Sequence, residues 1–469
     1  MKIFKSQKFL ILTGGLIFIV ALVVGGFVFF GKKSVNVDIV DDPPWFQPVV
    51  LEDVKLGTKV TWHLKSPAVH PVMSLETPTG TPEIHSGHFT DTFSYTFDKL
   101  GIYVYICPIH PYMKGVVGVG QKVPKEKIPA WADWPPDYKE PPAGTPEIPG
   151  KGKIWLGAQF HKPSGKEKPG TLIVIDASNW KIEKIIEDKT LNNPHNLWEV
   201  DEKIVVANWF DLYISVFDKI TGSLEKHVWV GESPAHVHAH GTDKLYVTLQ
   251  GDDGVAILDK NFEVLTKIRA PKGPHGHWMS ADGKRMSLAS TEKGMVTVWD
   301  TDTDKKILEE SVGEEMIGHD QDAHTHSLPL MAGITLDGKN AFTATSNTGK
   351  FYVFDIDNNK LVKSIDIGSV PIQTVPSPDG KYVLVPLTGS GEVVVISTKD
   401  WGIVKKIPGA GFGAHGVYFG EKQDDGWYAY VSSKFATWVT VIEMDKLEIA
   451  GYIPLPKDAW GGQGILVVK

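Results

Sequence analysis

The stretch VPIQTVPSPDGKYVLVPLTGSGEVVVISTKDWGIVKKI, residues 370–407, decides the fold of most of this chain. Its SPDG and TGSG segments are turn sequences, because aspartate, proline and glycine adopt the backbone angles that tight turns need. The valine- and isoleucine-rich runs between them are typical of short strands. The stretch therefore predicts a unit of four antiparallel strands in about 40 residues.

The same unit recurs along the chain. SPAHVHAHGTDKLYVTLQGDDGVAILDKNFEVLTKI (233–268) and GPHGHWMSADGKRMSLASTEKGMVTVWDTDTDKKIL (273–308) follow the same order of strands and turns. A four-stranded repeat of about 40–50 residues is typical of β-propeller blades. Six units begin near 194, 234, 274, 329, 371 and 414, and GILVVK (464–469) would join strands from 151–187 in a seventh. Because such closure removes exposed sheet edges, we predict a seven-bladed propeller over residues 151–469.

The residues before the repeats form two further regions. Residues 35–123 contain alternating runs such as KVTWHL and IYVYIC, which predict a small β-sandwich and make the whole protein all-β. Residues 124–150 are proline-rich and lack periodicity, so we expect a semi-stiff linker. The tryptophans at 131 and 134 indicate that this linker packs on a neighbouring surface.

The N-terminus predicts a membrane anchor. Residues 9–30 are uncharged and almost wholly apolar, which is long enough for one transmembrane helix, and lysines flank the run on both sides. A cleaved signal peptide, the alternative, has an apolar region of only about 7–15 residues. We therefore expect residues 1–34 to anchor the domains outside the cytoplasm, in the periplasm or at the cell exterior. The net charge of -8 argues against a nucleic-acid partner.

The segment IYVYICPIHPYMKGVVGV, residues 102–119, contains a metal-ligand pattern. A type 1 copper site needs two imidazoles, one thiolate and a weak axial thioether. Cys107, His110 and Met113 can supply three of these from one tight loop, and His70 follows an earlier strand. Cys107 is also the only cysteine, so it cannot form a disulfide within the chain.

This region resembles the cupredoxins, and its short ligand loop is similar to that of amicyanin. The resemblance covers residues 35–123 and implies one-electron transfer at a copper ion held by His70, Cys107, His110 and Met113. It further implies that His110 is the exposed ligand, surrounded by an apolar rim that includes Pro111 and Tyr112. The alternative is a cupredoxin-like domain that has no metal.

Histidines recur where the innermost strand of each blade begins. His195, His275 and His415 occupy the same blade position, and further histidines lie nearby in sequence. The starts of the innermost strands line one mouth of a propeller channel, so we expect these imidazoles to converge. Because clustered imidazoles repel one another when protonated, a metal ion would organise them. All-nitrogen ligation suits copper, zinc or iron.

The PHG-type strand starts resemble the catalytic propeller of nitrous oxide reductase, and the SPDGK turns resemble lactonase-like propellers. The first resemblance implies a multinuclear copper centre, sulfide-bridged as in that family. Its ligands would be His195, His236, His238, His275, His277, His326 and His415, with His240, His324 and His319 as substitutes and Asp320 and Asp322 as partners that orient the imidazoles. This chain departs from the family, which carries a two-cysteine copper domain at the C-terminus. Two blades also offer Gln373 and Gln463 where the others offer histidine.

These features predict a copper oxidoreductase in which the type 1 site feeds the propeller centre and a small nitrogen oxide, nitrous oxide first, is reduced. Expected partners are an electron-donor protein or a quinol-linked chain and a small inorganic substrate. The alternatives are an oxidase with reversed electron flow, a copper-binding electron-transfer protein, and a metal-dependent hydrolase of lactonase type. A homodimer, in which the copper domain serves the neighbouring propeller, also remains open.

Overall fold

The computed structural model describes residues 34–108, 110, 112–239, 243–313 and 327–469. Their architecture is all-β, as the sequence predicts, with the short 3-10 helix η1 (Lys125–Lys127) beside 36 strands within these ranges. The predicted anchor, 9–30, lies outside the described residues, and none of the described helices is long and apolar enough to cross a membrane.

An N-terminal sandwich contains two four-stranded sheets. One sheet has the order β2 (Phe46–Gln47), β1 (Ser34–Ile39), β4 (Thr58–Leu64) and β6 (Thr92–Phe97). The other has the order β3 (Val50–Val54), β8 (Lys114–Val119), β7 (Gly101–Ile106) and β5 (Met73–Glu76). Alternation along β4 turns Val60 and Trp62 inward. Trp62 meets Tyr105 of the opposite sheet with ring centroids 5.2 Å apart, which joins the two sheets through one core.

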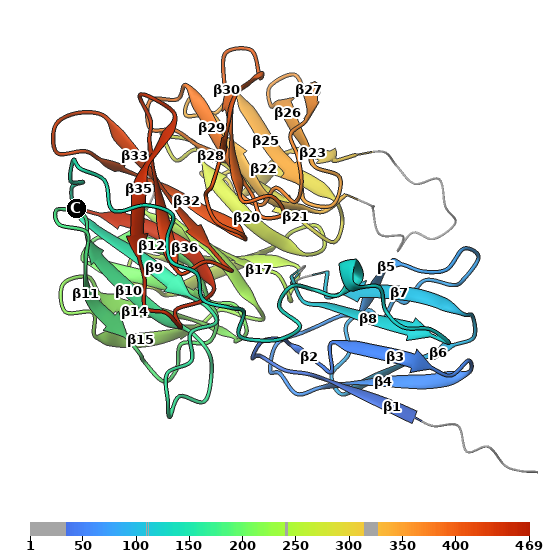
Figure 1. Ribbon diagram of the computed structural model, residues 1–469. Helices are drawn as coiled ribbons and strands as arrows, with labels where there is room; N and C mark the ends of the chain where they lie inside the picture. Colours follow the sequence, from blue (N-terminus) through green and yellow to red (C-terminus); the bar gives the residue numbers. More distant parts are fainter. Residues whose placement is uncertain (1–33, 109, 111, 240–242, 314–326) are drawn as a thin grey trace, which may run out of the picture.

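The rest of the described chain, many of whose strands Figure 1 labels, forms seven units of four strands around a central channel. Two of these units join into one eight-stranded sheet. The first unit contains β11 (Lys181–Ile186), β10 (Thr171–Asp176), β9 (Lys153–Ala158) and the C-terminal β36 (Gly462–Val468). This pairing of the first and last propeller strands closes the ring as the sequence predicts, because β36 completes the sheet that β9 begins.

The other six units each use four consecutive strands, and the first strand of each lines the channel. The second and third units are β12 (Pro194–Val200), β13 (Lys203–Asn208), β14 (Tyr213–Asp218), β15 (Leu224–Trp229), and β16 (Pro234–His238), β17 (Lys244–Leu249), β18 (Gly254–Asp259), β19 (Val264–Arg269). The fourth and fifth are β20 (Pro274–Met279), β21 (Arg285–Ser290), β22 (Met295–Asp300), β23 (Lys305–Ser311), and β24 (Pro329–Ile334), β25 (Asn340–Thr345), β26 (Lys350–Asp355), β27 (Lys360–Asp366). The last two are β28 (Val375–Pro376), β29 (Tyr382–Leu387), β30 (Glu392–Ser397), β31 (Ile403–Pro408), and β32 (Ala414–Glu421), β33 (Trp427–Ser433), β34 (Trp438–Glu443), β35 (Glu448–Pro454).

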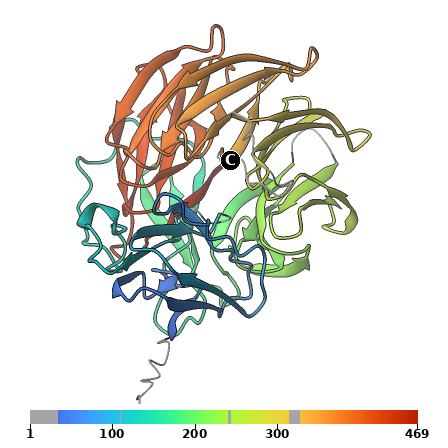
Figure 2. The same cartoon turned by 90° about the vertical axis from the view of Figure 1, so that its right-hand side faces the viewer.

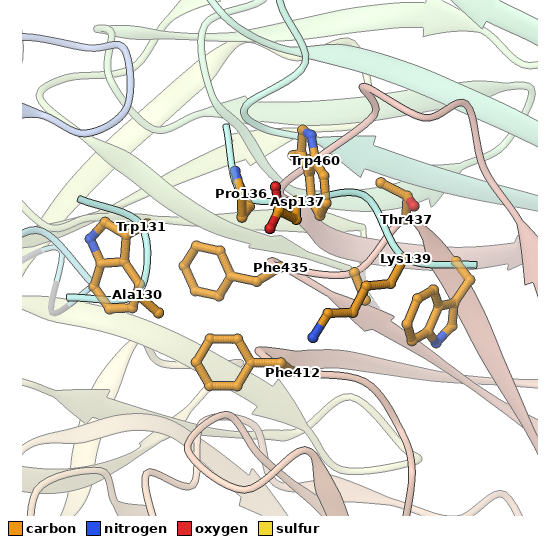
Figure 3. A pocket seen from close by; sticks show the side chains of 11 residues that line it. Ala130, Trp131, Pro136, Asp137, Lys139, Phe412, Phe435, Thr437 and Trp460 are labelled. Carbon is orange, nitrogen blue, oxygen red and sulfur yellow. The ribbon is translucent and has the colours of Figure 1, made fainter. Parts of the chain in front are cut away.

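The segment between the sandwich and the propeller packs against the last blades. Trp131 stacks on Phe435 with centroids 4.8 Å apart and the rings parallel to within 1°. The indole of Trp180 donates a hydrogen bond to the carbonyl of Pro146 at 2.9 Å. A pocket of about 440 Å³ lies beside this contact, where Figure 3 shows Trp131, Phe435 and Phe412 around it.

The sandwich docks on the mouth of the channel at which the innermost strands begin, and Figure 2 views the molecule from the side of the sandwich. One hydrophobic cluster spans both parts, with Trp45 and Tyr112 from the sandwich and Phe160, Trp209 and Phe210 from the propeller. Three polar contacts surround it: Lys162 with Asp42 at 2.6 Å, Asn192 with Asp41 at 3.2 Å and His88 with Glu292 at 3.6 Å. The sandwich therefore contacts the propeller of its own chain in this structure.

Candidate metal centres

Three possible metal ligands converge in the sandwich, and we call them with Met113 the Cys107 group. The Nδ1 atoms of His70 and His110 lie 2.9 Å apart. The Cys107 sulfur lies 3.4 Å from His110 Nδ1 and 3.9 Å from His70 Nδ1. Donors held about 2 Å from a shared ion stand about 3–4 Å from one another. The group could therefore hold one metal ion.

The end of β7 builds this group. Cys107 follows the last residue of the strand, so its side chain emerges where the alternating pattern stops. The loop then turns tightly, because the amide of His110 donates to the Cys107 carbonyl at 3.1 Å and the amide of Met113 to the His110 carbonyl at 2.7 Å. His70 comes from the connection between β4 and β5, and its Nε2 lies 3.1 Å from the Ser66 hydroxyl. With Nε2–H donating to that hydroxyl, Nδ1 keeps its lone pair for a metal.

Burial keeps these imidazoles neutral. It lowers the pKa of His70 to about 3 and that of His110 well below the ordinary value. A neutral imidazole is the form that binds a metal, because one ring nitrogen then has a free lone pair. Met113 is also fully buried and belongs to the same hydrophobic cluster as Cys107.

A second convergence lies in the propeller, and we call it the propeller histidine group: His195, His236, His275, His277 and His415. Three of them, His195, His236 and His275, place ring nitrogens within 4.8 Å of one another and could hold a metal ion. The Nε2 atoms of His195 and His275 are 3.1 Å apart. His277 lies beside His236, and His415 beside His195, each with ring centroids 6.3 Å apart.

Glycines explain why the histidines meet. A glycine follows the histidine in both PHG (274–276) and AHG (414–416). In the structure, each of these glycines touches the innermost strand of the next blade. A Cβ atom on Gly276 would stand 2.7 Å from the carbonyl oxygen of Leu330. A Cβ atom on Gly416 would stand 2.1 Å from the carbonyl oxygen of Gln463. A larger residue would push the blades apart, so these glycines hold His275 and His415 close to the channel axis.

Hydrogen bonds orient the rings toward one another. His275 Nδ1 donates to the Leu330 carbonyl at 2.5 Å, which leaves Nε2 as the lone-pair nitrogen facing His195. The Gln463 amide lies 3.2 Å from His195 Nδ1. Both ring nitrogens of His277 and Nδ1 of His415 are buried without a hydrogen-bond partner in the described residues.

The electrostatics of the propeller histidine group also suit a metal. Burial lowers the pKa of His275 to about 4 and of His277 to about 3, and it lowers the pKa of His195, His236 and His415 well below 6.5. Metal binding needs neutral imidazoles, and buried donors without partners are costly unless a ligand satisfies them. The residues present therefore fit a nitrogen-ligated metal centre.

Not every predicted ligand joins this group. The ring of His238 stacks on Trp198 with centroids 3.7 Å apart, one step farther along the channel, although the same ring also approaches His277 at 5.8 Å. The remaining candidates lie outside the described residues: His240, His319, His324, His326, Asp320 and Asp322.

A tryptophan that the sequence reasoning missed stands between the two groups. The Trp209 ring lies 4.2 Å from the His110 ring and 3.8 Å from the His195 ring, measured between centroids. Its indole N–H donates to Gln250 Oε1 at 2.9 Å, which fixes the ring. Phe210 packs beside it, 4.4 Å from His110. The available signal was the apolar WF pair between β13 and β14, where a blade turn is usually polar.

The position of His110 corrects an expectation. The cupredoxin resemblance implies an exposed ligand, but His110 is fully buried here because Trp209 and Phe210 cover it.

Lys434 is a second residue, after Trp209, that the sequence does not single out. It is buried, with its ammonium 4.5 Å above the Tyr112 ring and 2.5 Å from Gln159 Oε1. Burial lowers the pKa of Lys434 well below its ordinary value.

Comparisons with known proteins identify the propeller. No protein-family model and no curated protein sequence match the chain. A functionally unknown protein from Desulfotomaculum acetoxidans matches in structure with a TM-score of 0.52 and 15% identity, over 67% of this chain and 98% of that one. A candidate 6-phosphogluconolactonase from Bacteroides uniformis matches with a TM-score of 0.50 and 17% identity, over 67% and 99%.

Hydrazine synthase from Kuenenia stuttgartiensis has a TM-score of 0.45 and 22% identity, over 55% of this chain and 78% of that one. At the identities of the other two structures, likeness bears on the fold alone. The described chain therefore contains a β-propeller, as the repeats predict, and its fold is similar to that of the candidate lactonase.

Proposed function

We propose that this protein is a copper oxidoreductase in which a type 1 copper site in the sandwich exchanges electrons with a multicopper centre in the propeller. His70, Cys107, His110 and Met113 would hold the first copper, since two imidazoles, a thiolate and a thioether are the donor set of that site. His195, His236, His275, His277 and His415 would hold the second centre through neutral imidazoles. Copper supplies reversible one-electron chemistry at both places.

One observation carries the proposal: the Trp209 ring contacts both His110 and His195. Two sets of buried metal donors are thereby separated by a single aromatic ring, with no solvent-filled gap needed between them. An electron that leaves the sandwich through His110 meets Trp209 next and then His195. Phe210 and the other buried aromatic side chains exclude water from this route.

We propose nitrous oxide as the substrate. Its reduction takes two electrons and two protons and yields dinitrogen and water, so it suits a site that receives electrons one at a time and can store them. The resemblance of the PHG strand starts to nitrous oxide reductase supports this choice. The propeller histidine group contains imidazoles and no carboxylate in the described residues, which disfavours a lactonase-type hydrolase.

The proposal includes a cellular setting. Residues 9–30 would anchor the protein in a membrane with both domains outside the cytoplasm, and an electron-donor protein or a quinol-linked chain would reduce the type 1 site. Because the propeller covers His110, that donor must approach the sandwich from a face other than the one which a free cupredoxin would use.

Metal analysis of anaerobically purified protein tests the proposal. We expect one copper with an intense blue absorption band from the Cys107 group and additional copper in the propeller. A His275→Ala, His195→Ala double variant should keep the blue band and lose the additional copper. If protein that was loaded with copper in the cell carries only one copper per chain, that result would contradict the multicopper centre.

A further inference from the structure

The channel of the propeller is closed toward the sandwich by aromatic side chains. Trp209 is 2% exposed and lies between the Cys107 group and the propeller histidine group, and Phe210 beside it is fully buried. A substrate that arrives from the sandwich side would have to displace the rings that connect the two groups. The opposite end of the channel has a different construction.

Two cavities lie in line on that opposite side. An inner cavity of about 10 Å³, room for about one water molecule, touches His236 and His277 of the propeller histidine group. An outer cavity of about 450 Å³ lies beyond it and is lined by residues such as Met279, Leu336 and Trp427. Four side chains line both cavities and separate them, and we call them the aromatic collar: Trp198, His238, Trp278 and Tyr418.

The collar is a packed set of rings. Trp198 lies 3.7 Å from His238, 5.8 Å from Trp278 and 5.9 Å from Tyr418, measured between ring centroids. The Trp198 indole donates to the Ala239 carbonyl at 2.5 Å, which holds that ring in place. Trp278 and Tyr418 are only partly buried, whereas Trp198 and His238 are buried, so the first two rings are the more exposed members of the collar.

The inner end of the path offers a buried group that lacks a partner. His277 is 1% exposed and lines the inner cavity, and neither of its ring nitrogens has a hydrogen-bond partner in the described residues. A buried imidazole in this state is costly unless something binds it. His277 therefore places the inner end of the path directly beside the nitrogens that would hold the metal.

The lining sets the class of molecule that can pass. Apart from histidines, the residues that line the two cavities include one charged side chain among those described. It is Lys469, which lines the outer cavity. An anion would lose its hydration among tryptophan, leucine, methionine and valine side chains, and the amides of Asn196 and Gln373 in the inner cavity carry no charge that would compensate this loss. A small uncharged molecule loses little by entering such a lining.

We propose that a small, uncharged substrate reaches the propeller histidine group from the face opposite the sandwich, and that the aromatic collar is the gate which selects it. Electrons and substrate then arrive from opposite ends of one channel. This inference rests on the proposed function, because it takes the propeller histidine group as the metal-bearing site.

The association of carbon monoxide with reduced, copper-loaded protein tests the inference without enzyme turnover. We expect Trp278→Ala to bind carbon monoxide about tenfold faster than the parent, because the gate is widened. Ala281→Trp, which narrows the outer cavity at an exposed turn, should slow binding. Trp229→Ala is the matched control, since Trp229 is 66% exposed on β15 and does not line either cavity.

Azide tests the selectivity of the gate, because it is a linear triatomic molecule like nitrous oxide but carries a negative charge. The oxidised parent protein should bind azide slowly, and the oxidised Trp278→Ala variant should bind azide much faster. Unchanged rates for both ligands in Trp278→Ala and Ala281→Trp, with normal copper content, would overturn the gate and leave the proposed function standing. A propeller that takes up no copper and binds neither ligand would overturn the proposed function and the gate together.

Discussion

The rings of Trp209 and His195 lie 3.8 Å apart between centroids and meet at 77°, and the other side of the same indole approaches His110 at 4.2 Å. One side chain of the propeller therefore contacts a predicted ligand from each metal centre. Under the proposed function, this contact would join the two sites into one electron-transfer unit.

Trp209→Leu should slow electron transfer between the two centres by about tenfold, because it removes the ring that contacts both ligands. Pulse radiolysis, which reduces the type 1 site and follows the return of its blue band, measures the rate. Phe210→Leu is the control, since the Phe210 ring lies 4.8 Å from His70 and 4.4 Å from His110 but has no ring contact with a histidine of the propeller within the described residues. Equal rates in Trp209→Leu and the parent would show that the electron takes another route.

Met113→Leu should keep the blue colour and raise the reduction potential of the sandwich copper. Loss of a weak axial thioether destabilises the oxidised ion more than the reduced one, whereas the trigonal ligands remain. Cys107→Ser should abolish the blue band, because the thiolate is lost. A redox titration monitored at the blue band distinguishes these results, and an unchanged potential in Met113→Leu would remove Met113 from the ligand set.

Metal-free protein should lose stability as the pH falls below about 6.5. Buried His70, His275 and His277 stay neutral in the folded protein down to a pKa of about 3 or 4. The unfolded chain binds a proton at each of them near pH 6.5, so it binds more protons than the folded state between these values. Each such histidine should lower the free energy of unfolding by about 1 kcal/mol between pH 7 and pH 5.5.

Urea unfolding of the metal-free parent and of His277→Leu at the two pH values measures this effect. The variant should show the smaller loss, because a titrating imidazole is absent. Equal losses in the two proteins would mean that His277 is protonated in the folded state.

Lys434→Met should change how stability depends on pH in the alkaline range. Burial lowers the pKa of Lys434 in the folded protein, whereas the unfolded chain keeps its ordinary affinity for a proton. The unfolded state therefore binds more protons, and the parent gains stability as the pH rises toward 10. The variant should lack this gain. Urea unfolding of both proteins at pH 7 and pH 9.5 measures it, as the difference between their changes in the free energy of unfolding.

The sequence predicted what short-range patterns determine. Turn-bounded strands gave the propeller, the C-terminal run at 464–469 closed its ring, and the spacing of Cys107, His110 and Met113 matched a loop that the structure brings together with His70. The glycines after His275 and His415 are visible in the sequence as PHG and AHG patterns, but only the folded structure brings them against the neighbouring blades.

What the sequence could not supply depends on contacts between distant segments. No local pattern indicates that Trp209 meets His110, because the linker and the strands β9 to β13 lie between them in the chain. The separation of His236 from His238 was also missed. Both belong to β16, but only His236 lies within 4.8 Å of His195 and His275 through its ring nitrogens, whereas His238 stacks on Trp198.

The most direct measurement follows a single turnover. Copper-loaded protein is reduced anaerobically, freed of reductant and mixed with isotope-labelled nitrous oxide, while the blue band and the dinitrogen formed are recorded together. Our account predicts that the blue band returns as labelled dinitrogen appears, and that Trp209→Leu delays the return of the band. A band that stays bleached in fully loaded parent protein, with no dinitrogen formed, would contradict the account.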